Sequence, residues 1–219
     1  MRDAIRRRLR RTARDSGTTL TELLVAMIVF GIAMVMIMTA AIAVQKVTKD
    51  SEAAADAVFQ TRQALATIDK QVRSGNVLFS PADEVTYVSS CEDLGSNQGS
   101  CMRIYTQANW SQKCVQWQVF PDGSTYVLRV RSWTPDWQTV GGVSAWSVAA
   151  RGLAQPTSTS APFTLDTDPA GKYGQRLLRV HLVAVNAKSG KDVALDASIS
   201  GRNTTYGYTG NECVPVPAA

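Results

Sequence analysis

Residues 17–44 decide the fold of this chain, and they read G-T-T-L-T-E-L-L-V-A-M-I-V-F-G-I-A-M-V-M-I-M-T-A-A-I-A-V. From Leu23 to Val44 there is no charged residue, and only Gly31 and Thr39 interrupt the apolar run. At about 1.5 Å per helical residue this segment spans roughly 33 Å, enough to cross the hydrocarbon core of a bilayer. We therefore expect a transmembrane helix over residues 18–45, with the carboxylate of Glu22 at its N-terminal edge.

Residues 1–17 have the composition of a targeting segment rather than of a folded element. They hold seven of the 23 basic residues and two of the 18 acidic ones, so the rest of the chain carries equal numbers, 16 of each. The net charge of +5 therefore belongs to this segment and does not indicate a nucleic-acid-binding surface. Arginines before an apolar helix place that side in the cytoplasm and the C-terminal part outside.

These features resemble the type IV pilin and type II pseudopilin superfamily, whose members carry a short basic leader that is cut after a glycine. Gly17 matches the residue before the cut, Thr18 the new N-terminus, and residues 19–24 (T-L-T-E-L-L) the start of the family's apolar helix. The resemblance implies that a prepilin peptidase cleaves after Gly17. It also implies that Glu22 pairs with the Thr18 amine of a neighbouring subunit during assembly.

The chain departs from the major pilins in ways that favour a minor pilin or a pseudopilin. Thr18 replaces the commoner aromatic residue or methionine, and Thr39 stands where major pilins have a helix-breaking proline, although Gly31 matches their glycine. Residues 63–77, with Asp69 and Arg73, and the stretch 201–203 are similar to the PilW/PulJ-like minor branch.

Glu22 also has a local interpretation. Residues 19–22 fit a capping box, in which the Thr19 hydroxyl and the Glu22 carboxylate satisfy free amides of the first turn. The two roles are compatible, because capping requires nothing of a neighbour. An ionised carboxylate near lipid is costly unless it is paired, which favours the assembly role.

An ordinary secretory signal peptide is the competing interpretation of the N-terminus. Residues 41–43 form an A-x-A site, and cleavage there would release a soluble protein that begins at Val44. The apolar run is longer than the usual 7–15 residues of such signals, and Glu22 would be out of place in one.

The residues after the apolar run predict an α+β fold, in which a long helix packs on an antiparallel sheet as in pilins. We expect residues 46–75 to extend the helix, with an apolar stripe and with Gly75 as its C-cap. The stripe consists of Ala54, Val58, Leu65, Ile68 and Val72. Residues 76–219 form the expected β-rich domain outside the membrane. Period-two alternation predicts strands at 102–106, 115–120, 126–131, 178–185 and 193–199.

Turn residues connect these strands in two places. Residues 121–124 (P-D-G-S) predict a hairpin, and residues 186–191 a second one. Residues 154–174 are rich in Pro, Ser, Thr and Gly, and we interpret them as a long surface loop. The tail from residue 213 to 219 contains two prolines and is expected to be extended.

Four cysteines, Cys91, Cys101, Cys114 and Cys213, lie in the outer domain. An even number in an oxidising compartment predicts two disulfides, for which three pairings exist. We favour Cys91–Cys101, which closes a small polar loop, with Cys114–Cys213, which ties the C-terminus to the sheet. No C-x-x-C spacing is present and the only histidine is His181, so we expect no metal site.

No catalytic motif is present, and we expect neither enzymatic activity nor a cofactor. His181 lies in an alternating strand and is interpreted as a half-exposed sheet residue. Residues 166–171 resemble the start of a calcium loop without its closing glutamate. Trp117 is expected in the core, whereas Trp133, Trp137 and Trp146 fit either core packing or an exposed contact patch.

The function that follows is a structural subunit of a type IV pilus or a type II secretion-like filament. Its expected partners are the prepilin peptidase, other pilin or pseudopilin subunits and the inner or cytoplasmic membrane. Nucleic acid would be bound only through the assembled filament. The alternative is a membrane-anchored or secreted binding protein, an adhesin or receptor, and a secreted enzyme of unrecognised type is a third possibility.

Overall fold

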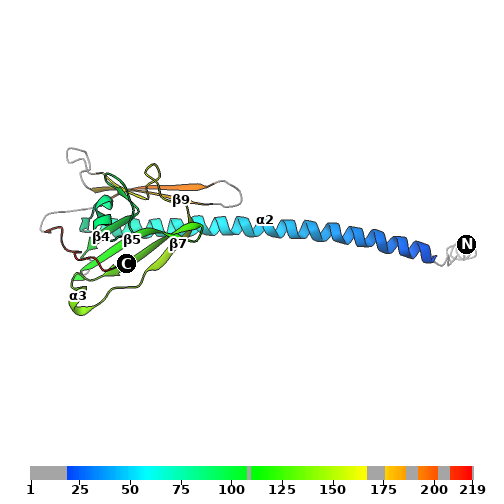
Figure 1. Cartoon of the computed structure of the whole chain (residues 1–219), viewed down its shortest axis with the longest axis horizontal. Coiled ribbons are helices and arrows are strands. Elements are labelled where there is room, and N and C mark those ends of the chain that lie inside the picture. The colour runs from blue at the N-terminus through cyan, green and yellow to red at the C-terminus, as the bar shows by residue number, and fades with distance from the viewer. Residues whose placement is uncertain (1–18, 108–109, 167–175, 186–191, 202–207, 219) are drawn as a thin grey trace, which may run out of the picture. The chain divides into compact units, whose positions relative to one another are not determined.

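The computed structural model describes residues 19–107, 110–166, 176–185, 192–201 and 208–218. The chain forms two compact units, residues 1–49 and 50–219. Helix α2 (Leu20–Ser74) contributes to both and is continuous over 55 residues (Figure 1). In the first unit every described residue, 19–49, is exposed.

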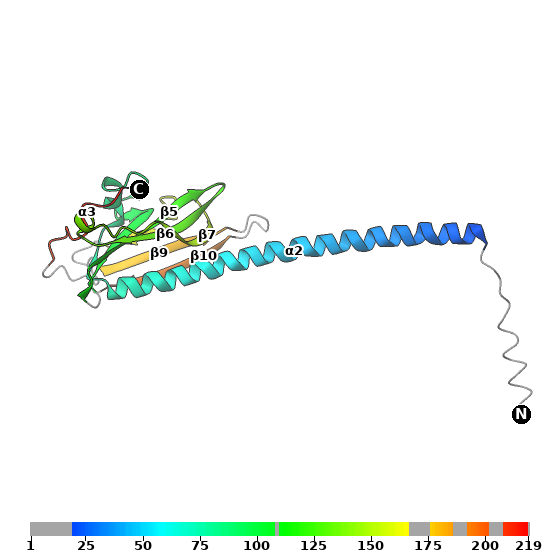
Figure 2. The same cartoon turned by 90° about the horizontal axis from the view of Figure 1, so that it is seen from below.

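The second half of α2 packs on the sheet of the second unit. Its buried residues are Thr61, Ala64, Ile68 and Val72, and the Thr61 hydroxyl donates to the Ala57 carbonyl at 2.7 Å. The predicted stripe is right at Ile68 and Val72, while its other members are only half-buried. Thr61 and Ala64 are buried as well, although they were not part of the predicted stripe. Figure 2 shows this half of α2 running along the sheet.

Helix α2 ends at Ser74, directly before Gly75, where the sequence predicted the helix end. The reason for a glycine at this position is not the predicted C-cap. Gly75 does not adopt the left-handed conformation of a glycine C-cap. A Cβ atom at this position would lie 2.7 Å from Ile104 Cγ2 and 3.1 Å from the Gln71 carbonyl oxygen. A glycine is needed here because the chain passes tightly against the sheet.

Ten strands form one sheet, and all of the pairings between them in the described residues are antiparallel. The strands are β1 (Val77–Leu78), β2 (Asp93–Gly95), β3 (Gln98–Gly99), β4 (Cys101–Thr106), β5 (Lys113–Asp122), β6 (Thr125–Trp133), β7 (Ser147–Leu153), β8 (Phe163–Leu165), β9 (Leu177–Ala184) and β10 (Val193–Ser200). The order is β1-β4-β5-β6-β7-β9-β8-β3-β2, with β10 on β9. The described residues of this unit also contain two short helices, η1 (Pro81–Thr86) and α3 (Trp137–Val140).

The five predicted strands are present as β4, β5, β6, β9 and β10, and the α+β prediction is confirmed. Gly123, with φ +64°, turns the chain between β5 and β6 where the hairpin was expected. Residues 186–191 lie outside the described residues, but β9 and β10, which they connect, pair along eight positions.

The prediction of one long surface loop over residues 154–174 is wrong. Strand β8 lies inside it, and Phe163 and Leu165 belong to the core. Strand β7 was also not predicted, because residues 147–153 (S-V-A-A-R-G-L) do not alternate. Strands β7 and β8 pair with different ends of β9, at Leu153 with Ala184 and at 163–165 with 178–180.

Both faces of the β4–β5–β6 part of the sheet are buried. Val115, Trp117 and Val119 face the core shared with α2, as predicted. Gln116 and Gln118 point to the opposite face, and each is 0% exposed. This second face is covered by η1, by the residues that follow it, and by the C-terminal tail (residues 208–218).

Candidate functional site

The apolar segment Leu23–Val44 forms the first part of α2, and its most apolar 18-residue window has a mean hydropathy of 2.7. Leu23, Gly31 and Val44 all lie on this helix and are exposed, and no atom outside the local helix lies within 4 Å of a Cβ placed on Gly31. An apolar helix of this length needs lipid or protein around it. Its length and composition suit a membrane span, and near an N-terminus they also suit a signal sequence.

Glu22 is the only charged residue between Leu20 and Val44. It lies in the first turn of α2, where its backbone N–H donates to the Thr19 carbonyl at 3.0 Å and to the Thr19 hydroxyl at 3.4 Å. This is the Thr19 half of the expected capping box. The Glu22 carboxylate is exposed and has no ion-pair partner among the residues described. Gly17 and Thr18, the predicted processing residues, lie outside the described residues.

Two disulfides stabilise the second unit, and their pairing is the one that we favoured. Cys91 pairs with Cys101, with a Cα–Cα distance of 5.6 Å, and Cys114 pairs with Cys213, with 5.7 Å. The second bond fastens the C-terminal tail to β5. Two disulfides and an apolar N-terminal helix fit an anchored or extracytoplasmic protein.

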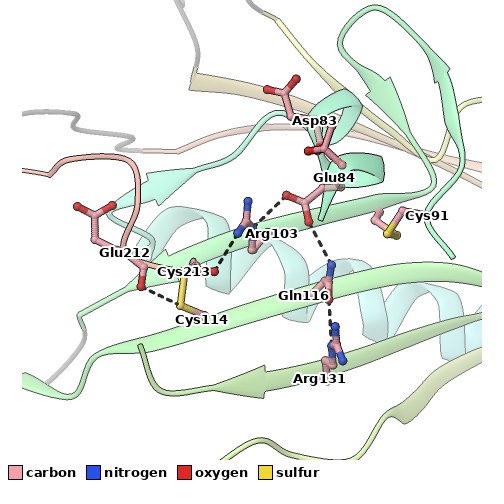
Figure 3. A network of polar contacts seen from close by, with 11 residues as sticks. Asp83, Glu84, Cys91, Arg103, Cys114, Gln116, Arg131, Glu212 and Cys213 are labelled. Carbon is pink, nitrogen blue, oxygen red and sulfur yellow. Dashed lines mark hydrogen bonds and ion pairs between the residues drawn. A yellow bond between two sulfur atoms is a disulfide. The ribbon is translucent and has the colours of Figure 1, made fainter. Parts of the chain in front are cut away.

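Three polar side chains lie in a row across the covered face of the sheet, because Arg103 on β4, Gln116 on β5 and Arg131 on β6 are register partners. Glu84 of η1 lies over this row (Figure 3). Its Oε1 accepts from Arg103 Nε at 3.0 Å, and its Oε2 accepts from Gln116 Nε2 at 3.1 Å. Gln116 Oε1 accepts from Arg131 Nε at 3.0 Å. All four residues are at most 3% exposed.

The C-terminal tail supplies the remaining acceptors for the two arginines. The Cys213 carbonyl accepts from Arg103 Nη1 at 2.9 Å. The Pro217 and Ala218 carbonyls accept from Arg131 Nη2 at 2.7 Å and from Arg131 Nη1 at 2.6 Å. Because a buried guanidinium without acceptors is costly, the arginines hold the tail in place as much as the tail covers them.

The electrostatics of this network follow from burial. Burial raises the pKa of Glu84 above its ordinary value, and the charge and hydrogen bond of Arg103 oppose that rise. Burial, and then the nearby charge of Arg129, lower the pKa of Arg131 to about 10. Glu84 and its partners are engaged with one another and shielded from solvent, so they hold η1 and the tail on the sheet and do not form a reactive centre.

Arg129 belongs to the same face, one rung along β6. Its Nε and Nη2 both donate to Gln118 Oε1, at 3.0 and 2.7 Å. Its guanidinium stacks between the rings of Phe120 and Trp146, whose centroids lie 3.6 and 4.2 Å from Cζ. Burial lowers the pKa of Arg129. Sequence patterns did not indicate this arrangement, since Arg and Gln that alternate with apolar residues in a strand ordinarily face solvent.

The other residues that the sequence singled out are the tryptophans, His181 and the calcium-like stretch. Trp117 and Trp133 are each 1% exposed, so core packing is confirmed for both. Trp137 and Trp146 are half-buried, and the Trp137 indole N–H donates to the Pro215 carbonyl at 2.9 Å. His181 is half-exposed as predicted. Residues 167–171 of the calcium-like stretch lie outside the described residues, and within the described ranges no three His, Cys, Asp or Glu side chains cluster as metal ligands.

Comparison of the chain with protein-family models, with curated proteins and with solved structures gives no match. The fold and the N-terminal segment therefore define a class by architecture alone. The chain is a protein with a long, apolar N-terminal helix packed on an antiparallel sheet, an arrangement like that of pilins.

Proposed function

We propose that this chain is a minor pilin or a pseudopilin, a non-enzymatic structural subunit of a type IV pilus or a type II secretion-like filament. In this proposal a prepilin peptidase cleaves after Gly17, with the leader in the cytoplasm and the β-rich domain outside. The subunit waits in the inner or cytoplasmic membrane through Leu23–Val44 and then joins other subunits through α2. We propose no nucleic-acid partner for the isolated subunit.

The observation that carries the proposal is the Glu22 carboxylate in the first turn of an otherwise uncharged helix, without a partner among the described residues. An unpaired carboxylate at the centre of a membrane helix costs about 2.5–3.5 kcal/mol on insertion scales, and one in the first turn, at the edge of the span, costs less but is still unfavourable. Cleavage after Gly17 would create an ammonium group four residues away. In a filament of axially shifted subunits, the amine of one subunit reaches the carboxylate of the next and removes this cost.

The N-terminus of the native protein tests the proposal directly. Mass spectrometry of the purified native chain should find a polypeptide that begins at Thr18 with a methylated amine. An N-terminus at Val44 would instead identify a secreted protein, and an intact leader would identify a simple membrane anchor. Either result contradicts the filament proposal.

A matched pair of variants tests the role of the carboxylate. Glu22→Gln should leave membrane insertion unchanged and lower incorporation into sheared filaments by on the order of tenfold, the equivalent of about 1.4 kcal/mol. Glu52→Gln, which neutralises an exposed carboxylate further along α2, should assemble like the wild type. Equal incorporation of the two variants would show that Glu22 is only a helix cap.

A further inference from the structure

Strands β8, β9 and β10 expose the sheet face opposite the core, where no segment like η1 or the tail covers them in the described part of the chain. On this face lie Arg179 and His181 of β9 and Asp196 and Ser198 of β10, since their neighbours Leu178, Val180 and Leu182 point into the core. Strands β9 and β10 run side by side in Figure 2. The exposed face forms a groove with a volume of about 360 Å³, within the range of small-molecule sites.

The strand register places polar side chains in a row along the floor of the groove. Gln98 pairs with Thr164, Thr164 with Arg179, and Arg179 with Ser198. At about 4.8 Å between strands the row is roughly 14 Å long. Next to it, His181 Nδ1 is bonded to Asp196 Oδ1 at 2.5 Å.

The segment before β8 builds one wall of the groove. Ser158 and Thr159 line it, and they belong to a turn in which the Ser160 N–H donates to the Thr157 carbonyl at 3.0 Å and to the Thr157 hydroxyl at 3.1 Å. The wall is therefore held by its own hydrogen bonds. It presents hydroxyl groups, which both donate and accept.

The charges of the groove indicate what it accepts. Arg179 is exposed and has no ion-pair partner among the described residues, so its donors are free for a carboxylate. Among the described residues, the other side chains with acidic or basic groups that line the groove are Asp196 and His181, which bond to each other. Apolar side chains contribute little, since Val180 and its register partner Ala197 point into the core. The described lining residues therefore offer no pocket for the apolar anchors of a peptide.

We propose that this groove binds an acidic saccharide, with the sugar carboxylate on Arg179 and the ring hydroxyls on Thr164, Ser198 and the wall. No Phe, Tyr or Trp is among the described residues that line it. Binding therefore depends on hydrogen bonds and one ion pair, and we expect a monosaccharide to bind with a Kd of about 1–10 mM. The inference does not depend on the proposed filament.

The experiment uses the full chain in micelles of an amine-oxide detergent, whose headgroup is neither a sugar nor an anion. Methyl glucuronide, methyl glucoside and acetate are titrated separately, with saturation-transfer NMR on the ligand. We expect millimolar binding of the glucuronide and at least tenfold weaker binding of the glucoside and of acetate. Arg179→Gln should weaken glucuronide binding at least tenfold. Arg151→Gln, at an exposed arginine that pairs with Asp122 outside the groove, should not.

Each alternative result overturns the proposal in a defined way. Equal binding of acetate would make the groove a simple anion site, and equal binding of the glucoside would remove the role assigned to Arg179. No saturation transfer up to about 50 mM glucuronide would show that the groove binds no acidic saccharide. The unfolding midpoint of Arg179→Gln is measured in parallel, so that a loss of binding is not confused with a loss of fold. Because no assembly is involved, the outcome is independent of the Glu22 tests.

Discussion

Replacing Cys114 and Cys213 together by alanine should cost more stability than replacing Cys91 and Cys101. The two disulfides close loops with sequence separations of 99 and 10 residues, and these loops do not overlap. On the chain-entropy relation the long loop contributes about 4.7 kcal/mol and the short one about 2.7 kcal/mol. The expected difference in the free energy of unfolding is therefore about 2 kcal/mol.

Release of the tail increases this difference. Without the disulfide at Cys213, the hydrogen bonds from the two buried arginines must hold the tail on the sheet. Arg131 donates to two tail carbonyls, and Arg103 donates to one. If the tail detaches, the buried arginines lose these acceptors and Trp133 loses part of its cover. We expect red-shifted tryptophan emission in the Cys114/Cys213 variant before global unfolding, and wild-type emission in the Cys91/Cys101 variant.

The assay is urea unfolding of the full chain in micelles, followed by fluorescence and by far-UV circular dichroism. The wild type and both double variants are measured under the same conditions. Equal losses in the two variants, or a larger loss for Cys91/Cys101, would refute the reasoning that loop length and tail attachment dominate. A change in the denaturant slope would show that the reference unfolded state had changed as well.

Three further outcomes are expected. Gly75→Ala should lower the free energy of unfolding by about 1–3 kcal/mol, because its Cβ would lie 2.7 Å from Ile104 Cγ2; thermal unfolding measures it, and an unchanged midpoint would contradict the close approach. Trp117→Phe should lower the free energy of unfolding by about 1–2 kcal/mol, since the indole N–H donates to Gln71 Oε1 at 2.7 Å. If the lost bond is the cause, adding Gln71→Leu to the Trp117→Phe variant should restore part of this stability. No recovery in the double variant would argue against the bond as the cause. The pKa of Glu84 is raised in the folded state, so its contribution to stability falls as the pH rises from about 4.5 through the folded pKa. The difference in unfolding free energy between the wild type and Glu84→Gln should therefore change over this pH range. A difference that stays constant would refute the raised pKa.

Much of the fold could be predicted because its signals are local. The apolar run of α2, the alternation in β4, β5 and β6, and the turn at Gly123 each depend on a few adjacent residues. Strand β7 was missed because its residues do not alternate between apolar and polar, and β8 was missed because it is short. In β8 a three-residue strand is surrounded by Pro, Ser and Thr, whose usual meaning is a loop.

Sequence patterns could not predict that the polar network is buried. Arg103 and Gln116 alternate with apolar residues and therefore look solvent-facing, and only the folded chain shows that η1 and the tail cover them. Arg103 and the Cys213 carbonyl are 110 residues apart in sequence. Glu22 could be singled out from the sequence, since it is one charged residue in an otherwise apolar stretch of helix. The groove at Arg179 was not, because it combines residues from four strands and a turn.

The register between β4 and β5 has a consequence for how the protein is made. Cys213 is synthesised 99 residues after Cys114, so the Cys114 thiol must wait while the nascent chain grows. Cys114 lies opposite Tyr105, and Cys101 lies opposite Gln118. Four positions along a strand correspond to about 13 Å, well beyond the roughly 7 Å that a disulfide can bridge. Once the β4–β5 hairpin closes, it therefore keeps these two cysteines too far apart for Cys114 to pair wrongly with Cys101.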